Sequence, residues 1–260
     1  MTTKKGLGWH KDPPDKRDLL VTALLKGNTA PDQVNWRQFC PPVKDQLYTS
    51  TCVGQAAAIA FTTVAAIEKH KWDTSELFGY FIARYQHGAH NQDQGTGLRY
   101  LYKAVRTHGI CPANSWPFDP HNWGSPGEFI KKRINKDPDF AAYRKAFDQR
   151  WLAGYYRIES VSERIDQMKQ ALHEKGIINF GINVGAPFMD YTGGVIDNLG
   201  PSLGGHAMTI YGYYKNEYWL VQNSWGSNWG ESGHCKLSMR NAHQMRDIWV
   251  VKHTPRYSGT

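Results

Sequence analysis

Cysteine is scarce in this sequence of 260 residues, and its four copies are widely spaced. They are Cys40, Cys52, Cys111 and Cys235, and no two stand at the short spacing typical of a zinc site. We therefore expect no metal, and the sequence is not that of a small disulfide scaffold. If one cysteine has a chemical role, the three that remain cannot all pair within the chain, which favours a reducing compartment.

Long apolar runs are also absent. No stretch approaches the roughly 20 consecutive apolar residues that a membrane-spanning helix needs. Lys4 and Lys5 stand near the start, but no apolar segment follows them, so the start does not resemble a secretory signal. We expect no membrane span and a cytoplasmic protein, with export by another route or a trimmed leader as the alternatives.

Charge is unbalanced but not concentrated. The chain has 31 Lys and Arg against 23 Asp and Glu, a formal net charge of +8. The densest basic run, 131–133, is soon followed by Asp137 and Asp139, which is typical of a solvated helix face rather than of a phosphate site. We expect a monomer without a nucleic-acid partner.

The apolar pattern divides the chain into a polar start, a helical half and a β half. Residues 1–29 are polar and are interpreted as an extension. From Val53 onward, apolar residues recur at helical spacing and predict a buried helix over 52–69, capped by Ser50 or Thr51. Shorter helices are expected at 76–86, 98–108, 139–150 and 162–174, the last capped by Ser162. Strands are expected at 177–183, 206–214, 217–223 and 234–239, with a loop at 192–205.

Cys52 falls in the first turn of the long predicted helix. Unsatisfied backbone amides and the helix dipole favour negative charge there, and so favour a thiolate over a thiol. A small buried side chain is the alternative interpretation, since free cysteine is among the most buried residue types. The position of Cys52 alone favours neither a nucleophile nor a structural residue.

A histidine and an asparagine in the β half form a candidate pair. Residues 206–223 are typical of a hairpin that turns at Lys215 and Asn216. With a two-residue turn, His206 and Asn223 share one face of the sheet, with Cβ atoms about 7 Å apart or less. The amide would then fix the tautomer of His206 and leave its other ring nitrogen for a nucleophile. Taken singly, a histidine at the start of a strand is more often structural.

Four separated segments resemble the papain-like cysteine peptidases, in the order found in that family. PDQVNWRQFCPPVKDQ is similar to the start of the mature domain, GTGLRYLYKAVRTHGI to the helix after the substrate-binding glycines, GGHAMTIYGYY to the histidine strand, and YWLVQNSWGSNWGESGH to the Asn-Ser-Trp-Gly segment. The resemblance implies an α+β, two-lobed fold over 30–260, without a cofactor. A helical left lobe (about 40–150) and an antiparallel β-barrel-like right lobe (about 151–250) would flank the active-site cleft.

The same resemblance implies a role for each site residue. Cys52 would be the nucleophile, His206 the base, Asn223 the residue that orients it, and Trp225 the shield of their hydrogen bond. Gln46 would donate its side-chain amide to the oxyanion. The reaction implied is hydrolysis of a peptide or protein through an acyl-enzyme.

Substrate contacts are implied at two places. The backbone of Gly95, Thr96 and Gly97 would pair with an extended peptide, although a plain helix-entry turn is the alternative. Gly181 and Ala207 would border the specificity pocket.

The sequence departs from the family beside the nucleophile and at the start. Thr49 and Val53 stand where the family has a disulfide cysteine and a tryptophan, and only residues 1–29 precede the domain. They are interpreted as a short pro-segment over the cleft, unless activity is controlled otherwise, and 121–156 as an insertion. Two other functions stay open: a catalytically silent binding or inhibitory module, and an acyl transferase or ligase that uses the same Cys–His pair.

Overall fold

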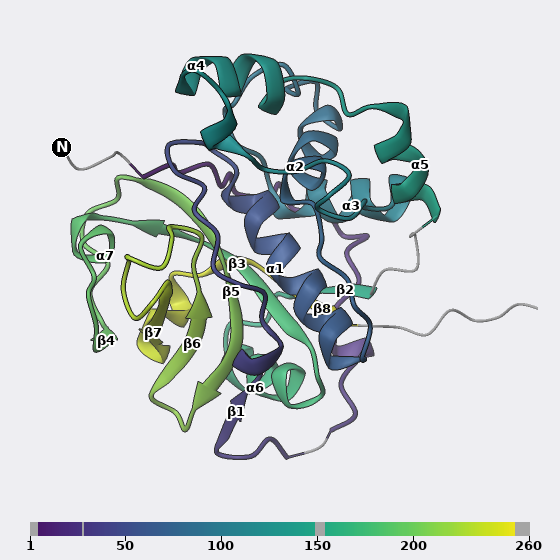
Figure 1. The fold of residues 1–260 in the computed structure, drawn as a ribbon. Helices are drawn as coiled ribbons and strands as arrows, with labels where there is room; N and C mark the ends of the chain where they lie inside the picture. Colours follow the sequence, from purple (N-terminus) through teal and green to yellow (C-terminus); the bar gives the residue numbers. More distant parts are fainter. Residues whose placement is uncertain (1–4, 28, 149–153, 253–260) are drawn as a thin grey trace, which may run out of the picture.

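The computed structural model describes residues 5–27, 29–148 and 154–252. Helices from the first half of the chain gather above a large sheet formed by the second half, and the long helix α1 runs between them (Figure 1). The helices are α1 (Cys52–Ile67), α2 (Glu76–Tyr85), α3 (Leu98–His108), α4 (Pro126–Phe129), α5 (Phe140–Asp148), α6 (Arg164–His173) and α7 (Ala186–Met189). None of the helices in these ranges is long and apolar enough to cross a membrane.

The sheet combines eight strands from both ends of the chain. Its order is β2-β8-β3-β5-β6-β7-β4, with β1 paired to β5, and every pair is antiparallel except β4 with β7. The strands are β1 (Gln33–Asn35), β2 (Gly154–Ile158), β3 (Ile177–Val184), β4 (Val195–Ile196), β5 (Gly204–Tyr214), β6 (Tyr218–Gln222), β7 (His234–Ser238) and β8 (Arg246–Lys252). The α+β class is confirmed, but the described strands form an open sheet rather than a closed barrel.

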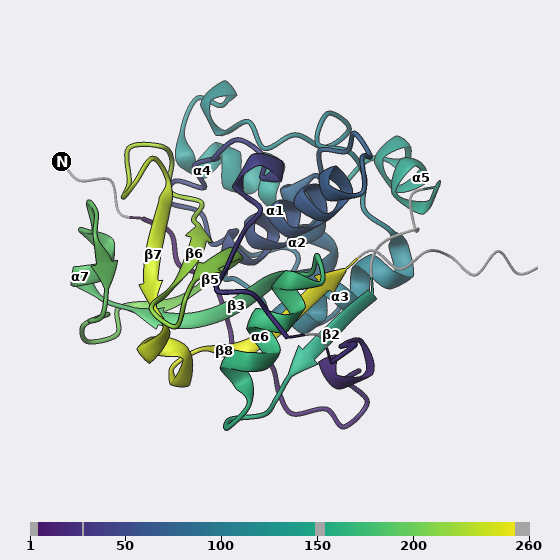
Figure 2. The same ribbon diagram turned by 90° about the horizontal axis from the view of Figure 1, so that it is seen from below.

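Helix α1 is buried on nearly every side because both halves of the molecule pack against it. Its alanines and glycine let neighbours approach closely: a Cβ on Gly54 would lie 2.4 Å from the carbonyl oxygen of Glu76 at the start of α2. One face of the sheet packs on α1, through residues such as Ala207 and Tyr211, and the opposite face carries α6 (Figure 2). The first turn of α1, with Cys52, is thereby fixed between the helical part and the sheet.

The expected helices are present, with differences at their ends. The long helix stops at Ile67 because Lys69 takes a left-handed conformation. Neither predicted cap forms as expected: the Thr51 side chain makes no capping hydrogen bond, and α6 begins after Glu163 rather than at Ser162. Positions 149 and 150 of the predicted helix 139–150 lie outside the described residues.

Four strands were not predicted, namely β1, β2, β4 and β8. Strand β4 lies inside the predicted loop 192–205, and β2 begins inside the predicted insertion 121–156 and continues past its end. Strand β8 pairs with β2 on one side and β3 on the other, and its unbroken apolar run has no alternation to mark it as a strand. These segments form strands because they pair with strands far away in the sequence, which a local pattern does not show.

The prediction of a two-residue hairpin turn is wrong. Tyr214 opposes Tyr218, so the turn holds three residues, and Tyr211 is an extra, bulged residue on β5. The bulge compensates for the longer turn, so that Thr209 opposes Gln222, as the two-residue turn required. Beyond this pair, His206 near the start of β5 and Asn223 just after β6 lie close enough for their side chains to form a hydrogen bond.

Candidate active site

Cys52 is the first residue of α1 and is fully buried. The backbone N–H groups of Ala207 on β5, of Gly8 near the start of the chain and of Val53 in the same helix turn act to lower the pKa of its thiol. Burial nevertheless outweighs these donors and raises the pKa of the Cys52 thiol to about 12. In this state Cys52 is a neutral thiol.

His206 precedes Ala207 on β5, is fully buried, and is oriented from one side. Its Nε2 lies 2.7 Å from Oδ1 of Asn223, and since an amide oxygen only accepts, Nε2 carries the proton. Nδ1 is left as an acceptor, buried and without a hydrogen-bond partner among the described residues. The ring of Trp225 stacks on the imidazole with centroids 4.4 Å apart. Burial lowers the pKa of His206 to about 4, although the Asn223 hydrogen bond acts to raise it.

Gln46 is fully buried, and hydrogen bonds hold both the oxygen and the nitrogen of its side-chain amide. Its Oε1 accepts from the hydroxyl of Ser224 (2.6 Å), and Ser224 in turn donates its backbone N–H to Oδ1 of Asn223 (2.7 Å). The Gln46 Nε2 is thereby left to donate to carbonyl oxygens, those of Thr49 and Gly6. Hydrogen bonds therefore connect Gln46, Asn223 and His206 through Ser224, which was missed, and Cys52 lies close to Ala207, the residue that follows His206.

Comparison with known proteins agrees with this geometry. The family model described as "Papain family cysteine protease" matches residues 30–251. The chain belongs to the papain family of cysteine proteases. It is 28% identical to an "uncharacterized peptidase C1-like protein" of Acanthamoeba polyphaga mimivirus, over 96% of this chain and 88% of the viral one. It is 26% identical to a "cathepsin L-like proteinase" of Phaedon cochleariae, over 88% of this chain and 67% of the beetle protein.

Solved structures of the papain family confirm the fold. Xylellain, a cysteine protease from Xylella fastidiosa, superposes with a TM-score of 0.78 at 26% sequence identity, over 97% of each chain. Procathepsin L2 of Tenebrio molitor superposes with a TM-score of 0.73 at 20% identity. The expected papain-like fold and the peptidase class are thus confirmed.

In this papain-family chain the N-terminal segment 5–10 lies between the helical part and the sheet (Figure 1) and passes the turn that precedes Cys52. The backbone of Thr96 donates to the Gly8 carbonyl (2.9 Å) and accepts from the N–H of His10 (3.0 Å). On the sheet side, the amides of Gly8 and Trp9 both donate to the carbonyl of Gly205 (3.1 Å each). The segment is therefore hydrogen bonded to both parts of the molecule.

Two glycines allow this close passage. A Cβ on Gly6 would lie 1.8 Å from the Thr49 carbonyl oxygen, and one on Gly8 would lie 2.1 Å from that of Ser50. Any side chain at either position would thus collide with the turn before Cys52. This role was missed in the sequence, where the only signal is a tryptophan that follows alternating glycines in an otherwise polar start.

Hydrogen bonds hold the turn before Cys52, at the place where the family would have a disulfide. The carboxylate of Asp93 accepts from the N–H of Ser50 (3.1 and 3.2 Å) and from the hydroxyl of Tyr80 (2.8 Å), and Tyr80 in turn accepts from the N–H of Gly95 (2.9 Å). The described cysteines form no disulfide. Asp93 thus connects the turn before Cys52 to Gly95, whose neighbour Thr96 pairs with the N-terminal segment.

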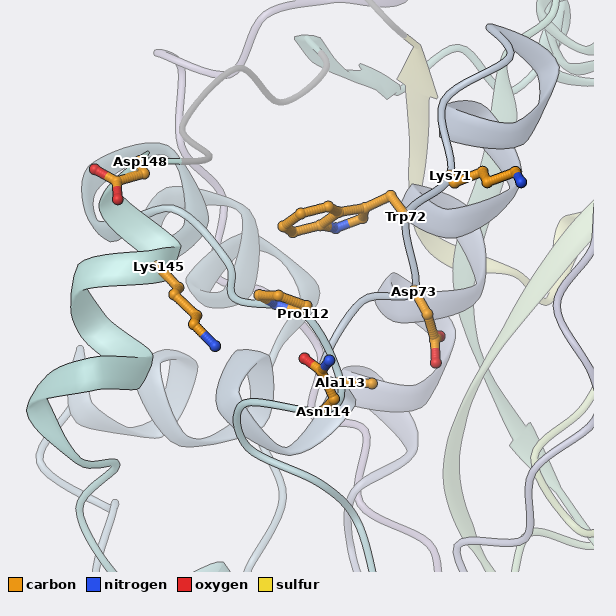
Figure 3. Close-up of a pocket in the computed structure, with 8 residues that line it drawn as sticks. All are labelled: Lys71, Trp72, Asp73, Pro112, Ala113, Asn114, Lys145 and Asp148. Carbon is orange, nitrogen blue, oxygen red and sulfur yellow. The ribbon is translucent and has the colours of Figure 1, made fainter.

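A cavity of about 610 Å³ lies away from these residues, in the helical part of the molecule (Figure 3). Trp72 projects over it, opposite helix α5. Its lining contains neither Cys52 nor His206 and consists of Lys71, Trp72, Asp73, Pro112, Ala113, Asn114, Lys145 and Asp148. This cavity is therefore separate from the candidate residues.

Proposed function

We propose that Cys52 and His206 hydrolyse peptide bonds as a thiolate–imidazolium pair. The observation that carries this proposal is the orientation of His206: Asn223 holds Nε2 at 2.7 Å, while the buried Nδ1 has no partner among the described residues. Ala207, the next residue along β5, is close enough to Cys52 for its backbone N–H to lower the pKa of the thiol. Nδ1 is the atom available to take the thiol proton.

The steps follow from these positions. The Cys52 proton passes to Nδ1 of His206, and the sulfur attacks the substrate carbonyl carbon, forming a C–S bond. The carbonyl oxygen becomes an oxyanion that accepts from Nε2 of Gln46. Nδ1–H then protonates the leaving amine as the C–N bond breaks. Water then gives one proton to Nδ1 as its oxygen attacks the thioester carbon. The C–S bond breaks, the carboxylic acid is released, and the Nδ1 proton returns to sulfur to restore the thiol.

Replacing Gln46 with alanine should reduce kcat about a hundredfold or more, because one preorganised oxyanion donor is lost. Ser224→Ala should cost less, since Gln46 loses the group that orients it but remains in place. Steady-state hydrolysis of a fluorogenic peptide measures both variants. A change in KM with kcat intact for Gln46→Ala would contradict the oxyanion role.

The N-terminal segment 5–10 inhibits the enzyme in this proposal. It occupies the backbone groups that a substrate needs: the Thr96 amide and carbonyl, and the side-chain amide of Gln46, which donates to the Gly6 carbonyl at 3.1 Å. The Gly8 N–H donates to the Gly205 carbonyl (3.1 Å) and also acts to lower the pKa of the Cys52 thiol, so the segment lies close to this sulfur. Because the segment also buries Cys52 and His206, it stabilises the neutral forms of both.

Residues 12–26 anchor this inhibitory segment to the enzyme. Asp12 is 2% exposed, and its carboxylate accepts the N–H of Arg99 (3.1 Å) in the first turn of α3, whose own N-cap Gly97 has no side chain to offer. Asp18 forms an ion pair with Arg99, and Val21 belongs to the core. Deleting all of residues 1–29 would therefore remove packing as well as inhibition, and displacing only 5–10 is the sharper test.

The Asp12 anchor should weaken as the pH rises from about 4 to about 7. Burial, and then the charge of Asp247, raise the pKa of Asp12 to about 7. The carboxyl is also faced by Arg99, Arg157 and the indole N–H of Trp249, which act to lower its pKa or pair with it. Since the native state then holds a proton that the unfolded state loses above about pH 4, native stability falls with rising pH in this window.

Asp12→Asn removes this titration. The melting temperature of the variant minus that of the wild type should therefore be more favourable at pH 8 than at pH 5. Asp15→Asn is the control, because hydrogen bonds from Arg17 and Lys103 lower the pKa of Asp15 and place its titration below this window. An Asp12→Asn difference that is equal at the two pH values would refute the assignment.

A further inference from the structure

Trp9 of the inhibitory segment occupies a recess beside the nucleophile. It is 7% exposed and lies on two glycines of the sheet: a Cβ on Gly181 would fall 1.9 Å from Trp9 Cε2, and one on Gly205 would fall 2.7 Å from Cε3. The indole N–H is buried, and no described residue accepts it. The recess holds the bulk of this ring and leaves its donor unsatisfied.

An unfilled cavity of about 350 Å³ adjoins the ring. Lys11 and Trp9 of the N-terminal stretch line it together with side chains of the enzyme body, which are Asn183, His243, Gln244 and Arg246. No carboxylate belongs to this lining. When segment 5–10 leaves, the recess and the cavity become one space with a polar, cationic far end.

Arg246 provides the fixed charge of this space. Its guanidinium donates to the carbonyl oxygens of His243 (2.6 Å) and Met245 (2.8 Å), and no described carboxylate lies within 4.0 Å of it. Burial, and then the nearby charge of Arg246, lower the pKa of Arg164. The electrostatic potential beside Arg246 is therefore positive, and no carboxylate of the described residues lies within 4.0 Å to offset it.

The sheet register places this charge within reach of a bound peptide. Ala207, whose N–H acts to lower the pKa of the Cys52 thiol, opposes Gly181 on β3, and Gly181 opposes Arg246 on β8, just past a register shift between Asn179 and Gly181. Residues directly opposite one another share a face, and neighbouring strands are about 4.8 Å apart, so the Arg246 backbone lies roughly 10 Å from that of Ala207. The side chain of a substrate residue close to the scissile bond spans this distance.

Resting on the proposed peptidase function, we propose that this space is a specificity pocket that selects an acidic side chain, with Arg246 as the residue that determines the choice. Gly181 and Gly205 admit the side chain, and the guanidinium pairs with its carboxylate. A lysine or arginine in the same place would meet an uncompensated like charge. The Trp9 ring covers the entrance without using the charge.

The test is a substrate profile of the full chain carrying Gly8→Ala, a substitution that displaces segment 5–10. Peptide libraries are varied at one position at a time, and a preference for Glu or Asp over Lys or Arg is expected at one position near the scissile bond. Arg246→Glu should lower the ratio of acidic to basic cleavage at that position at least about fivefold. Asn183→Asp, which adds a carboxylate without removing the Arg246 hydrogen bonds, should lower it in the same direction.

Arg240→Glu is the matched control, because it makes the same charge change outside the pocket, where the exposed Arg240 guanidinium lies 4.0 Å from Asp197. Its profile should equal that of the parent. Hydrolysis with no acidic preference, or a preference unmoved by Arg246→Glu and Asn183→Asp, overturns the pocket alone. Absence of both hydrolysis and covalent labelling of Cys52 overturns the proposed function, and the pocket with it.

Discussion

Gly8→Ala should raise the peptidase activity of the full chain about ten- to a hundredfold. The new Cβ would lie 2.1 Å from the Ser50 carbonyl oxygen, a contact that real structures do not tolerate, so the segment must move away. Overpacking of this kind costs typically about 1–3 kcal/mol, and each 1.4 kcal/mol changes the population of the displaced state about tenfold. Initial rates on a fluorogenic peptide, compared with wild type at equal enzyme concentration, measure the effect.

Gly127→Ala is the matched control for this substitution. A Cβ there meets nothing within 4 Å, so activity should stay at the wild-type value. Melting temperatures of both variants report whether the fold survives, since Asp12, Asp18 and Val21 still anchor the chain beyond the displaced segment. A folded Gly8→Ala chain with unchanged or lower activity would show that segment 5–10 does not inhibit.

In the Gly8→Ala background, Cys52→Ala should abolish hydrolysis, by at least about a thousandfold, and should also abolish labelling by a peptide epoxide or vinyl sulfone. The nucleophile is lost and no other group forms the thioester. The chain with Gly8 intact should label slowly, because Cys52 is fully buried and its thiol pKa is raised to about 12. Mass spectrometry of the intact protein and of its peptides identifies the labelled residue.

Cys111→Ala provides the control for labelling. Cys111 is equally buried, with a pKa also raised to about 12, but it lies outside the site, so its removal should leave labelling unchanged. Equal labelling of the Cys52→Ala chain and its parent would refute the proposed nucleophile. Labelling without hydrolysis, but with transfer to an added amine, would favour the acyl transferase alternative. Neither labelling nor hydrolysis would favour the silent binding module.

The site motifs and their order could be predicted from the sequence because each motif depends on residues that are close together in the chain. A cysteine in a first helical turn, a histidine at the start of a strand and an asparagine at the far side of a hairpin are recognised within short windows. The hairpin prediction reached the correct pairing through a wrong turn, since the bulge at Tyr211 offsets the extra turn residue. One residue less or more would have turned His206 to the other face.

Local sequence could not show which segment would cover the site. Gly6, Gly8 and Trp9 make their hydrogen bonds and contacts with Thr96, Gly205 and Gly181, which lie far along the chain. The polar composition of residues 1–29 suggested an extension, yet Trp9 and Val21 are almost wholly buried. Strand β8 was missed for a similar reason, because its partners β2 and β3 come from distant parts of the chain.

The sequence by itself determined the family, the two-part α+β arrangement and the candidate residues Cys52, His206, Asn223 and Gln46. These depend on residue type, order and periodicity, which the chain carries along its length. Only the tertiary structure decided that segment 5–10 lies over Cys52 and that Arg246 stands in one row with Gly181 and Ala207. Contact between residues remote in sequence is set by packing and strand register, which no local pattern encodes.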